Sequence, residues 1–429
     1  MTLLHAAPLR GLSPAREVLP NGLVVLTKTT AVTPAVTLNA SIRAGSAFDP
    51  PSIDGVAHFV SKVIDRGTDT RSADQIAEEL DGRGVSLAVT LTRQLLSLTC
   101  TCLVEDFDVV VALLSDIVRM PAFPVEEVRS RRGEVITLIK QDEDSPAVVA
   151  VDALMAMLYG QVHPYGRRSR GTVETAERID SAVLKGFHAD HVRPSNVSLA
   201  IVGDVESGRA LDVASAAFGG WTAAPSPGVT FPAIAASPAR RTRVVPMMNK
   251  SQTDIAYGFT AITRADPAYY AYSLMNNILG QYSLGGRLGD SIRERQGMAY
   301  YVFSSLDANV APGPLMIRAG VNPSNVERAV ASIDAELTSL VADGPTEQEV
   351  TESKQYLIGS LPRTLETNTG IAAFLQTVEF FGLGLDYDVR VPGLLRAITR
   401  DDVHEAARRA VDPSEATVVV AGPYDGSLS

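Results

Sequence analysis

Apolar residues in the first half of the chain follow two different spacings. Between residues 56 and 65 they recur every three or four positions, which predicts an amphipathic helix. Ser72 and Gln75 have the spacing of a capping box and predict the start of a second helix. Strands are predicted at residues 17–28, 36–44, 85–91, 95–104 and 197–203. Strands and helices therefore occur in mixed order, as in an α+β fold.

Two segments that lie 219 positions apart repeat one pattern. IDSAVLKGFHADHVRPSNVSLAIVGDV begins at Ile179, and ITRDDVHEAARRAVDPSEATVVVAGPY begins at Ile398. In both, a predicted helix is followed by a Pro-Ser turn and then by an apolar strand that reaches a glycine, Gly203 or Gly422. A supersecondary unit that recurs in the same register indicates a duplicated domain.

The stretch between the two copies has a different composition. Residues 221–241 contain prolines among alanines and serines and show no sustained periodicity, which is typical of a linker. We therefore predict two tandem homologous α+β domains, residues 1–220 and 242–429. Each is expected to contain a mostly antiparallel sheet with helices packed on one face.

Composition and charge narrow the class of protein. The 429 residues exceed the usual size of one domain, and 45% hydrophobic with 20% charged residues is ordinary for a globular protein. The net charge is −11 and basic residues are interspersed with acidic ones, which argues against a nucleic-acid partner. No apolar run has the length of a signal peptide or membrane span, so we expect a cytoplasmic protein without a membrane partner. Cys100 and Cys102 alternate along a predicted strand and are expected to be buried thiols.

Residues 285–305 contain the most specific candidate chemistry. The sequence predicts a short helix, a stop at Gly297 and a strand, with Arg293 near the end of the helix and Tyr300 early in the strand. A guanidinium and a phenolic hydroxyl on either side of a tight reversal could together hold a peptide carbonyl and the negative charge that develops on its oxygen. The ordinary alternative is that Arg293 complements the helix dipole and Tyr300 is a strand residue at the edge of the core.

The duplicated pattern, together with this stretch in its second copy, resembles the M16 zinc metallopeptidases, the insulinase, pitrilysin and mitochondrial processing peptidase family. The resemblance extends over nearly the whole chain. The segments on which it depends are, in order, GVAHFVSKVIDRGTDTRS, VHPYGRRSRGT, HVRPSNVSLAIVGD, NNILG, IRERQGMAY, LPRTLET and ITRDDV. If the resemblance holds, the chain is half of a clam-shell dimer.

The resemblance also implies that a zinc site has been lost. Active members contain His-x-x-Glu-His on the helix that here reads His58-Phe59-Val60-Ser61-Lys62, so His58 alone matches. Ser61 replaces the general base and Lys62 replaces the second ligand. The third ligand, a glutamate about 76 residues further on, aligns with Leu138 or its neighbour Thr137. Glu134 and Glu143 lie close enough in sequence for a shift in alignment to restore one ligand, but not three. We expect no cofactor in this chain and zinc in a partner subunit.

The second half of the chain matches the family where the first half departs from it. Arg293 and Tyr300 have the identity and spacing of the pair that binds the substrate backbone and stabilises the tetrahedral intermediate. The resemblance thus implies a substrate-positioning subunit, inactive alone, that pairs with a homologous chain containing His-x-x-Glu-His and cleaves oligopeptides.

Two alternatives stay open. One is a catalytically inactive structural or peptide-binding pseudopeptidase, either a homodimer or a core subunit of a larger assembly. The other is hydrolysis by this chain alone through an unrecognised metal site. His188 and His191 could share a helical face in such a site, although histidines near a helix end more often complement its dipole.

Overall fold

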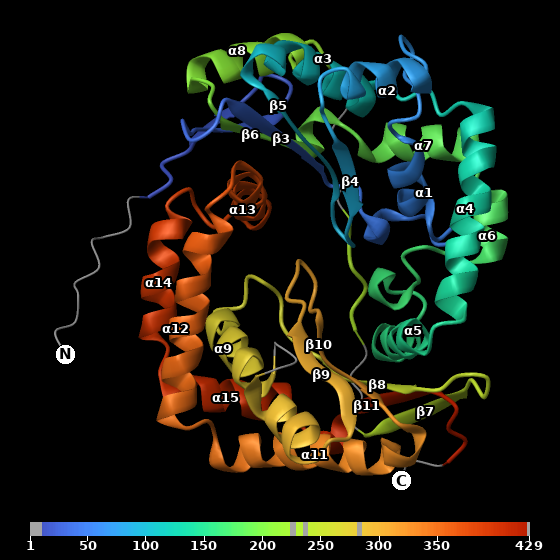
Figure 1. Cartoon of the computed structure of the whole chain (residues 1–429), viewed down its shortest axis with the longest axis vertical. Helices are drawn as coiled ribbons and strands as arrows, with labels where there is room; N and C mark the ends of the chain where they lie inside the picture. Colours follow the sequence, from blue (N-terminus) through green and yellow to red (C-terminus); the bar gives the residue numbers. More distant parts are fainter. Residues whose placement is uncertain (1–10, 224–228, 235–238, 281–284, 427–429) are drawn as a thin grey trace. The chain divides into compact units, whose positions relative to one another are not determined.

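The computed structural model describes residues 11–223, 229–234, 239–280 and 285–426. Within these ranges the chain forms two β-sheets, each covered by helices (Figure 1). Residues 224–228 and 235–238 of the predicted linker lie outside the described residues, and a strand begins at Arg241.

The first sheet has the strand order β1-β2-β6-β3-β5-β4. β2 and β6 run parallel, whereas the other neighbouring strands described in this sheet run antiparallel. The strands are β1 (Ala15–Val18), β2 (Val24–Thr29), β3 (Ala35–Ile42), β4 (Leu87–Leu91), β5 (Leu96–Leu103) and β6 (Val197–Gly203). The two flanks of the predicted strand at residues 17–28 form β1 and β2, and the other strands predicted in this half form β3 to β6.

Helices cover one face of this sheet. Alternate strand residues such as Val25, Leu38 and Ile201 are fully buried and form one core with the apolar sides of the covering helices. The helices of this core are α1 (Val56–Val63), α2 (Ala73–Asp81), α3 (Phe107–Arg119), α7 (Ser181–His191) and α8 (Ser207–Phe218). Two more helices of this half, α4 (Val125–Glu143) and α6 (Val173–Arg178), also contribute buried residues to this core, among them Val135 and Ala176.

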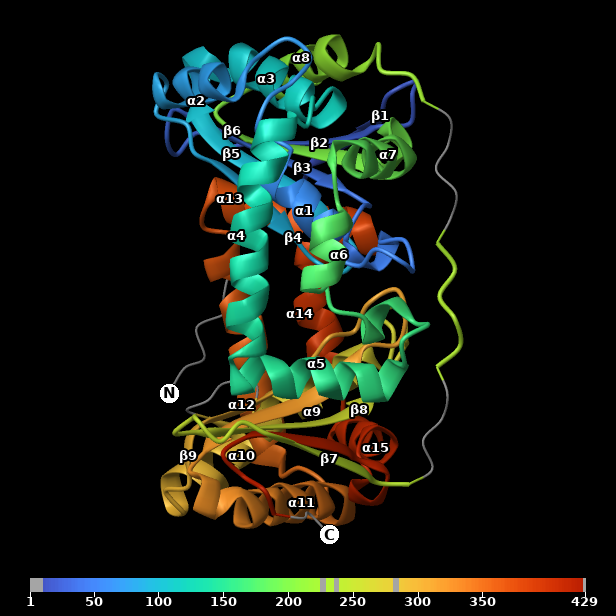
Figure 2. The ribbon, with the colours of Figure 1, turned by 90° about the vertical axis from the view of Figure 1, so that its right-hand side faces the viewer.

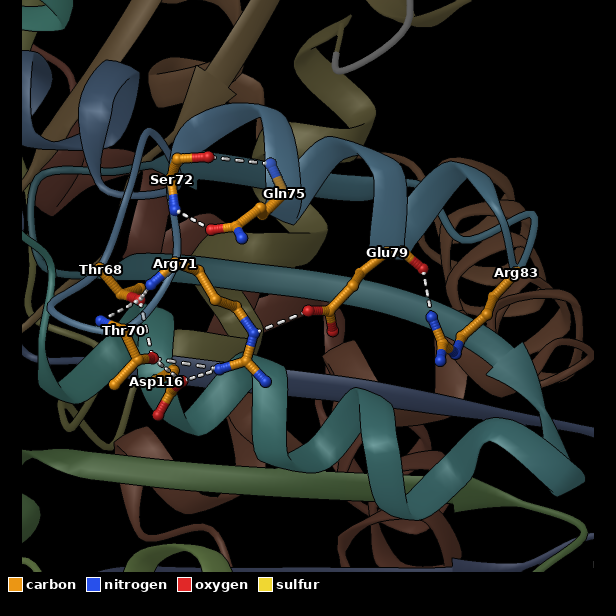
Figure 3. Close-up of polar contacts among 8 residues, drawn as sticks. All are labelled: Thr68, Thr70, Arg71, Ser72, Gln75, Glu79, Arg83 and Asp116. Carbon is orange, nitrogen blue, oxygen red and sulfur yellow. Dashed lines mark hydrogen bonds and ion pairs between the residues drawn. The ribbon is translucent and has the colours of Figure 1, made fainter.

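The predicted capping box at the start of α2 is present (Figure 3). The Ser72 hydroxyl accepts a hydrogen bond from the Gln75 backbone at 3.2 Å, and the Gln75 side chain accepts one from the Ser72 backbone at 2.8 Å. Just before the helix, Arg71 forms ion pairs with Glu79 of α2 and with Asp116 of α3. The local sequence therefore begins this helix, and the ion pairs fix it to its neighbour.

The second sheet repeats the arrangement of the first. Its order is β7-β11-β8-β10-β9, again with one described parallel pair, β7 and β11. The strands are β7 (Arg241–Pro246), β8 (Thr253–Thr260), β9 (Ala299–Leu306), β10 (Pro314–Val321) and β11 (Thr417–Gly422). Omitting β1, the two orders correspond strand for strand. The predicted duplication of α+β domains is thus confirmed.

The helices of the second half include α9 (Tyr269–Gly280) and α11 (Val326–Asp343), whose buried residues share a core with Ile255, Tyr257 and Ile317. The second half also contains α10 (Gly286–Leu288), α12 (Glu347–Thr364), α14 (Tyr387–Ala397) and α15 (Arg400–Ala410), besides a helix described below. α15 begins and ends 219 residues after α7, as the repeat predicts.

The two halves of the chain exchange a helix. α13 (Asn368–Phe381), from the second half, packs on β3 and β6, where Leu375 lies in a small core with Leu26 and Val202 (Figure 1). This face of the first sheet is opposite to the one that α3 and α8 cover. α5 (Pro146–Tyr159), from the first half, packs on β8 and β11, on the side of the second sheet away from α11 (Figure 2).

Because of this exchange, each compact unit is discontinuous in sequence. One unit comprises Met1–Ile139, Arg168–Thr230 and Ser360–Arg390, and the other comprises Lys140–Arg167, Phe231–Gly359 and Val391–Ser429. Across the described ranges, every helix is too short or too polar to cross a membrane.

Candidate functional site

Arg293 lies at the end of a helix whose inner face is buried. α10 continues directly into a π-helical segment, Gly289–Arg295, and Leu288 and Ile292 are fully buried beneath it. Gly297 has a φ of +61°, a left-handed conformation that favours glycine, and ends the helix as the sequence predicts. Its N–H donates to the Arg293 carbonyl at 3.0 Å, and the Met298 N–H donates to the Ile292 carbonyl at 3.1 Å. The reversal between Arg293 and the strand is therefore closed by backbone hydrogen bonds.

A second contact fixes the start of this helix. Arg287 donates to both carboxylate oxygens of Glu349, at 2.7 and 2.9 Å, and to the Gly344 carbonyl at 3.0 Å. Its side chain is 15% exposed, and Glu349 belongs to the first turn of α12. A bidentate ion pair of this kind restricts the relative orientation of the two side chains as well as their distance. The π-helical segment is thus held at its start by an ion pair and at its end by the glycine turn.

Tyr300 lies at a β-bulge in an edge strand. In the pairing of β9 with β10, Tyr301 faces Gly320 and Ala299 faces Val321, so Tyr300 is the extra residue. Its side chain is 63% exposed. A bulge changes the direction of a side chain relative to regular pairing, and bulges are frequent at sheet edges and beside functional sites. The tyrosine that the sequence singles out therefore has a special backbone position.

The next residue, Tyr301, anchors β9 across the sheet. Its hydroxyl donates a hydrogen bond to Asp254 of β8, and Gln252 also donates to that carboxylate at 3.3 Å. β10 lies between β9 and β8, and at the crossing point it has Gly320, where a Cβ would lie 2.5 Å from the Tyr301 ring. Asp254 is 3% exposed. Burial raises the pKa of both Asp254 and Tyr301, which favours the neutral phenol as the hydrogen-bond donor.

The degenerate zinc motif lies on α1, in the other compact unit. His58 is 8% exposed, and its pKa is lowered to about 4, first by burial and then by the charges of Lys62 and Arg170. Its Nε2 is buried without a hydrogen-bond partner among the described residues. The Ser61 hydroxyl donates to the His58 carbonyl at 2.6 Å, within the same helix. His58 thus offers one neutral imidazole, the Ser61 hydroxyl is bonded to the backbone, and Lys62 is a cation. This set of groups does not fit a zinc ion.

The aligned positions on α4 have no carboxylate, and the two glutamates near them are exposed. Leu138 is half-buried, and Thr137 is exposed with its hydroxyl bonded to the Gly133 carbonyl at 2.8 Å. Glu134 is exposed and forms an ion pair with Arg131 at 2.6 Å; its pKa is lowered chiefly by that hydrogen bond. Glu143 is exposed at the last residue of α4.

The two histidines of α7 have structural contacts. The His188 Nε2 lies 2.8 Å from the Val118 carbonyl, and the His191 ring packs against Phe48 and Phe187. Burial lowers the pKa of both imidazoles. In the portion of the chain that the structure describes, no cluster of three or more His, Cys, Asp or Glu residues is arranged to hold a metal ion.

The sequence points to Arg293 and Tyr300 as candidates but not to the contacts that hold their segment in place. The bulge and the Tyr301–Asp254 hydrogen bond depend on which strands pair and in which register, and a single sequence does not contain this information directly. A local feature that accompanies the bulge is Gly320 of β10, since a glycine inside a strand often marks a bulge or a close approach.

Comparisons with known proteins agree with this architecture. Residues 24–172 match the family model described as Insulinase (Peptidase family M16), and residues 178–357 match the model described as Peptidase M16 inactive domain. A protein of Bacillus subtilis (strain 168) described as an uncharacterized zinc protease, YmxG, is 26% identical over 348 residues, which cover 81% of this chain and 83% of the relative. A protein of Mycobacterium tuberculosis (strain ATCC 25618 / H37Rv) with the same description is 27% identical and covers 99% of this chain and 96% of its own length.

Solved structures give the same result. The crystal structure of a peptidase M16 inactive domain from Pseudomonas fluorescens has a TM-score of 0.90 and 25% identity, and covers 97% of this chain and 99% of that one. A protease from Helicobacter pylori shares the fold, with a TM-score of 0.88 at 17% identity, and covers 95% of this chain and 99% of that one. Two models of one family match successive parts of the sequence, and this chain therefore belongs to peptidase family M16, the insulinase family.

Proposed function

We propose that this chain is the zinc-free, substrate-positioning subunit of a heterodimeric M16-type metalloendopeptidase that acts on oligopeptides in the cytoplasm. The observation that supports it best is a contrast within one chain. The Arg293–Tyr300 segment is present and held by a bidentate ion pair, a glycine turn and a bulge. In contrast, α1 matches the zinc motif at His58 alone, and the aligned position on α4 is Leu138 or Thr137.

Within the proposed complex, each subunit supplies a different part of the reaction. Arg293 and Tyr300 would donate hydrogen bonds to the carbonyl of the scissile peptide and to the oxyanion that forms when water attacks it. The zinc ion and the general base would belong to the partner subunit, a homologous chain that contains His-x-x-Glu-His. Two such chains in a clam-shell arrangement would enclose the peptide. The chain alone is expected to be inactive.

A second candidate function is favoured by a separate observation. The second-half family model and the Pseudomonas fluorescens structure are both described as an M16 inactive domain. A catalytically inactive structural or peptide-binding pseudopeptidase, in a homodimer or a larger assembly, would keep the fold and have no need for zinc in a partner.

Affinity purification from the native cells separates the two candidates. The tagged full-length chain is captured, and the co-purifying proteins are identified and quantified by mass spectrometry. The proposal predicts a similarly sized M16 protein with an intact His-x-x-Glu-His motif, near one copy per copy of this chain. Recovery of the chain alone or as a homodimer would contradict the heterodimer and favour the pseudopeptidase.

A further inference from the structure

A cavity of about 940 Å³ lies at one end of the second sheet, within a single compact unit and apart from Arg293 and Tyr300. It is bounded by residues 231–234, the first residue of β7, the end of β8, the β9–β10 connection and the segment after α15. Its apolar wall includes Leu158, Phe231, Phe259 and Val310. Its lining also includes polar and charged residues, among them Thr260 and Thr417. A cavity of this size that combines apolar and polar groups can hold a small ligand.

Arg241 is the half-buried cation of this cavity. Its terminal nitrogens donate to the Met157 carbonyl at 2.6 Å and to the Thr417 hydroxyl at 2.8 Å, which leaves one N–H on each of them. Among the described residues, no carboxylate lies within ion-pair distance of its guanidinium, and burial alone lowers its pKa. The neighbouring Arg240 differs, because it pairs with Asp334 at 3.0 Å and its pKa is raised. Arg241 is therefore a desolvated charge that lacks a counter-ion.

The other charges of the cavity lie at its rim and have contacts of their own. Arg408 pairs with Glu405 at 3.1 Å, and Arg409 lies 3.8 Å from Asp266. Asp412 accepts hydrogen bonds from the backbone and hydroxyl of Ser414, and Glu415 is exposed. Bulk water screens exposed charges of this kind, whereas it screens a half-buried guanidinium less. Among the charged residues that line the cavity, Arg241 is thus the one that is half-buried, and the apolar side chains of Phe231 and Phe259 line the same cavity.

From these contacts we infer that the cavity binds a carboxylate attached to an apolar chain, with the carboxylate on Arg241 and the chain along Phe231, Phe259 and Val310. A guanidinium pairs well with a carboxylate because two parallel N–H groups can meet its two oxygens. Two sources share this chemistry, the C-terminal end of a peptide with an apolar last residue and a free fatty acid. The inference does not depend on the proposed peptidase role, because binding is a property of this chain alone.

Isothermal titration calorimetry on the purified full-length chain tests it with three probes. These are N-acetyl-Leu-Phe with a free carboxylate, the same dipeptide as its C-terminal amide, and octanoate. The acid is expected to bind about tenfold more tightly than the amide, since only the acid can neutralise Arg241. If octanoate binds as tightly as the peptide acid, the carboxylate ligand of the cavity is a free fatty acid. If octanoate binds more weakly, the ligand is the C-terminal end of a peptide. Equal affinity for acid and amide, or no binding of either acid, would overturn the inference.

A pair of matched variants locates the site without disturbing the fold. Val310 is 45% exposed and lines the cavity, so a polar replacement is tolerated. V310D places a negative charge beside the ligand and is expected to weaken binding of the acid about tenfold while the amide changes less than about twofold. V310N has nearly the same shape without the charge and is expected to change neither by more than about twofold. An equal effect of V310D and V310N on the acid would place the binding elsewhere.

Discussion

Tyr300 and Tyr301 are neighbours in the sequence with opposite environments. Tyr300 is exposed at the bulge, whereas the Tyr301 hydroxyl is bonded to the buried Asp254. We expect Tyr301→Phe to lower the free energy of unfolding by about 1–3 kcal/mol, because it leaves a buried carboxylate with a missing donor. Tyr300→Phe is the matched control, with a change within about 0.5 kcal/mol. Urea denaturation of the purified chain measures both, and equal losses in the two variants would show that Tyr301 does not anchor β9.

His58 makes stability depend on pH. Its pKa in the folded chain is lowered to about 4 from a usual value of 6.5, so the unfolded chain binds this proton at pH values where the folded chain does not. Stability from this group is therefore fully present above pH 6.5 and is lost as the pH falls towards 4, by about 3 kcal/mol at most. His58→Gln should lose less stability than the wild type between pH 7 and pH 4. The free energy of unfolding of both proteins is measured by urea denaturation at several pH values between 7 and 4. If it falls equally in His58→Gln and in the wild type, the lowered pKa of His58 does not cause the loss.

At the level of single residues, local features could be predicted and register could not. The buried positions of Leu288 and Ile292 and the left-handed Gly297 follow from helical spacing and from the glycine itself. The bulge at Tyr300 could not be predicted from the local sequence, because a shift of one residue depends on where β10 pairs with β9.

For helices and strands, the local sequence does not show which sheet a helix packs on. In the structure, α13 buries one face that includes Leu375 and Gln376, and nothing local in the sequence specifies which sheet receives that face. In the structure the Gln376 side chain donates to the Asn39 and Ser198 carbonyls of the first sheet, at 2.6 and 2.9 Å, and accepts from the Ser198 hydroxyl. A polar residue with several partners in the receiving sheet makes this docking specific.

The docking of α13 can be tested by one substitution and its neighbour. Gln376→Ala leaves polar groups of β3 and β6 without their partner, and we expect it to lower the free energy of unfolding by about 2–3 kcal/mol. Thr377→Ala is the control, because the exposed Thr377 hydroxyl bonds only within its own helix, to the Ala373 carbonyl at 3.0 Å. Chemical denaturation followed by circular dichroism measures both variants. Equal stability of Gln376→Ala and Thr377→Ala would show that these bonds do not hold the helix.

At the scale of the whole molecule, the internal repeat was the most informative feature of the sequence. The register that aligns Ile179 with Ile398 predicted a duplicated unit, and both sheets have the same strand order once β1 is set aside. The exchange of α5 and α13 was not predicted, because the repeat shows that two units exist and not which helix completes which unit. For function, the sequence of α1 departs from the zinc motif at Ser61 and Lys62, and it is our proposal that a second chain supplies the missing ligands.

The proposed role of Arg293 in substrate positioning can be measured through the turnover number of the complex. The chain is combined with its co-purified partner, and peptide hydrolysis is compared for wild type, Arg293→Ala and Arg295→Ala. Arg295 is a matched control, because it lies two residues away on the same segment and pairs with Asp290 at 3.1 Å. We expect a turnover number about 100- to 1000-fold lower for Arg293→Ala and nearly unchanged for Arg295→Ala, with assembly intact in both. An undiminished turnover in Arg293→Ala would contradict the substrate-positioning role.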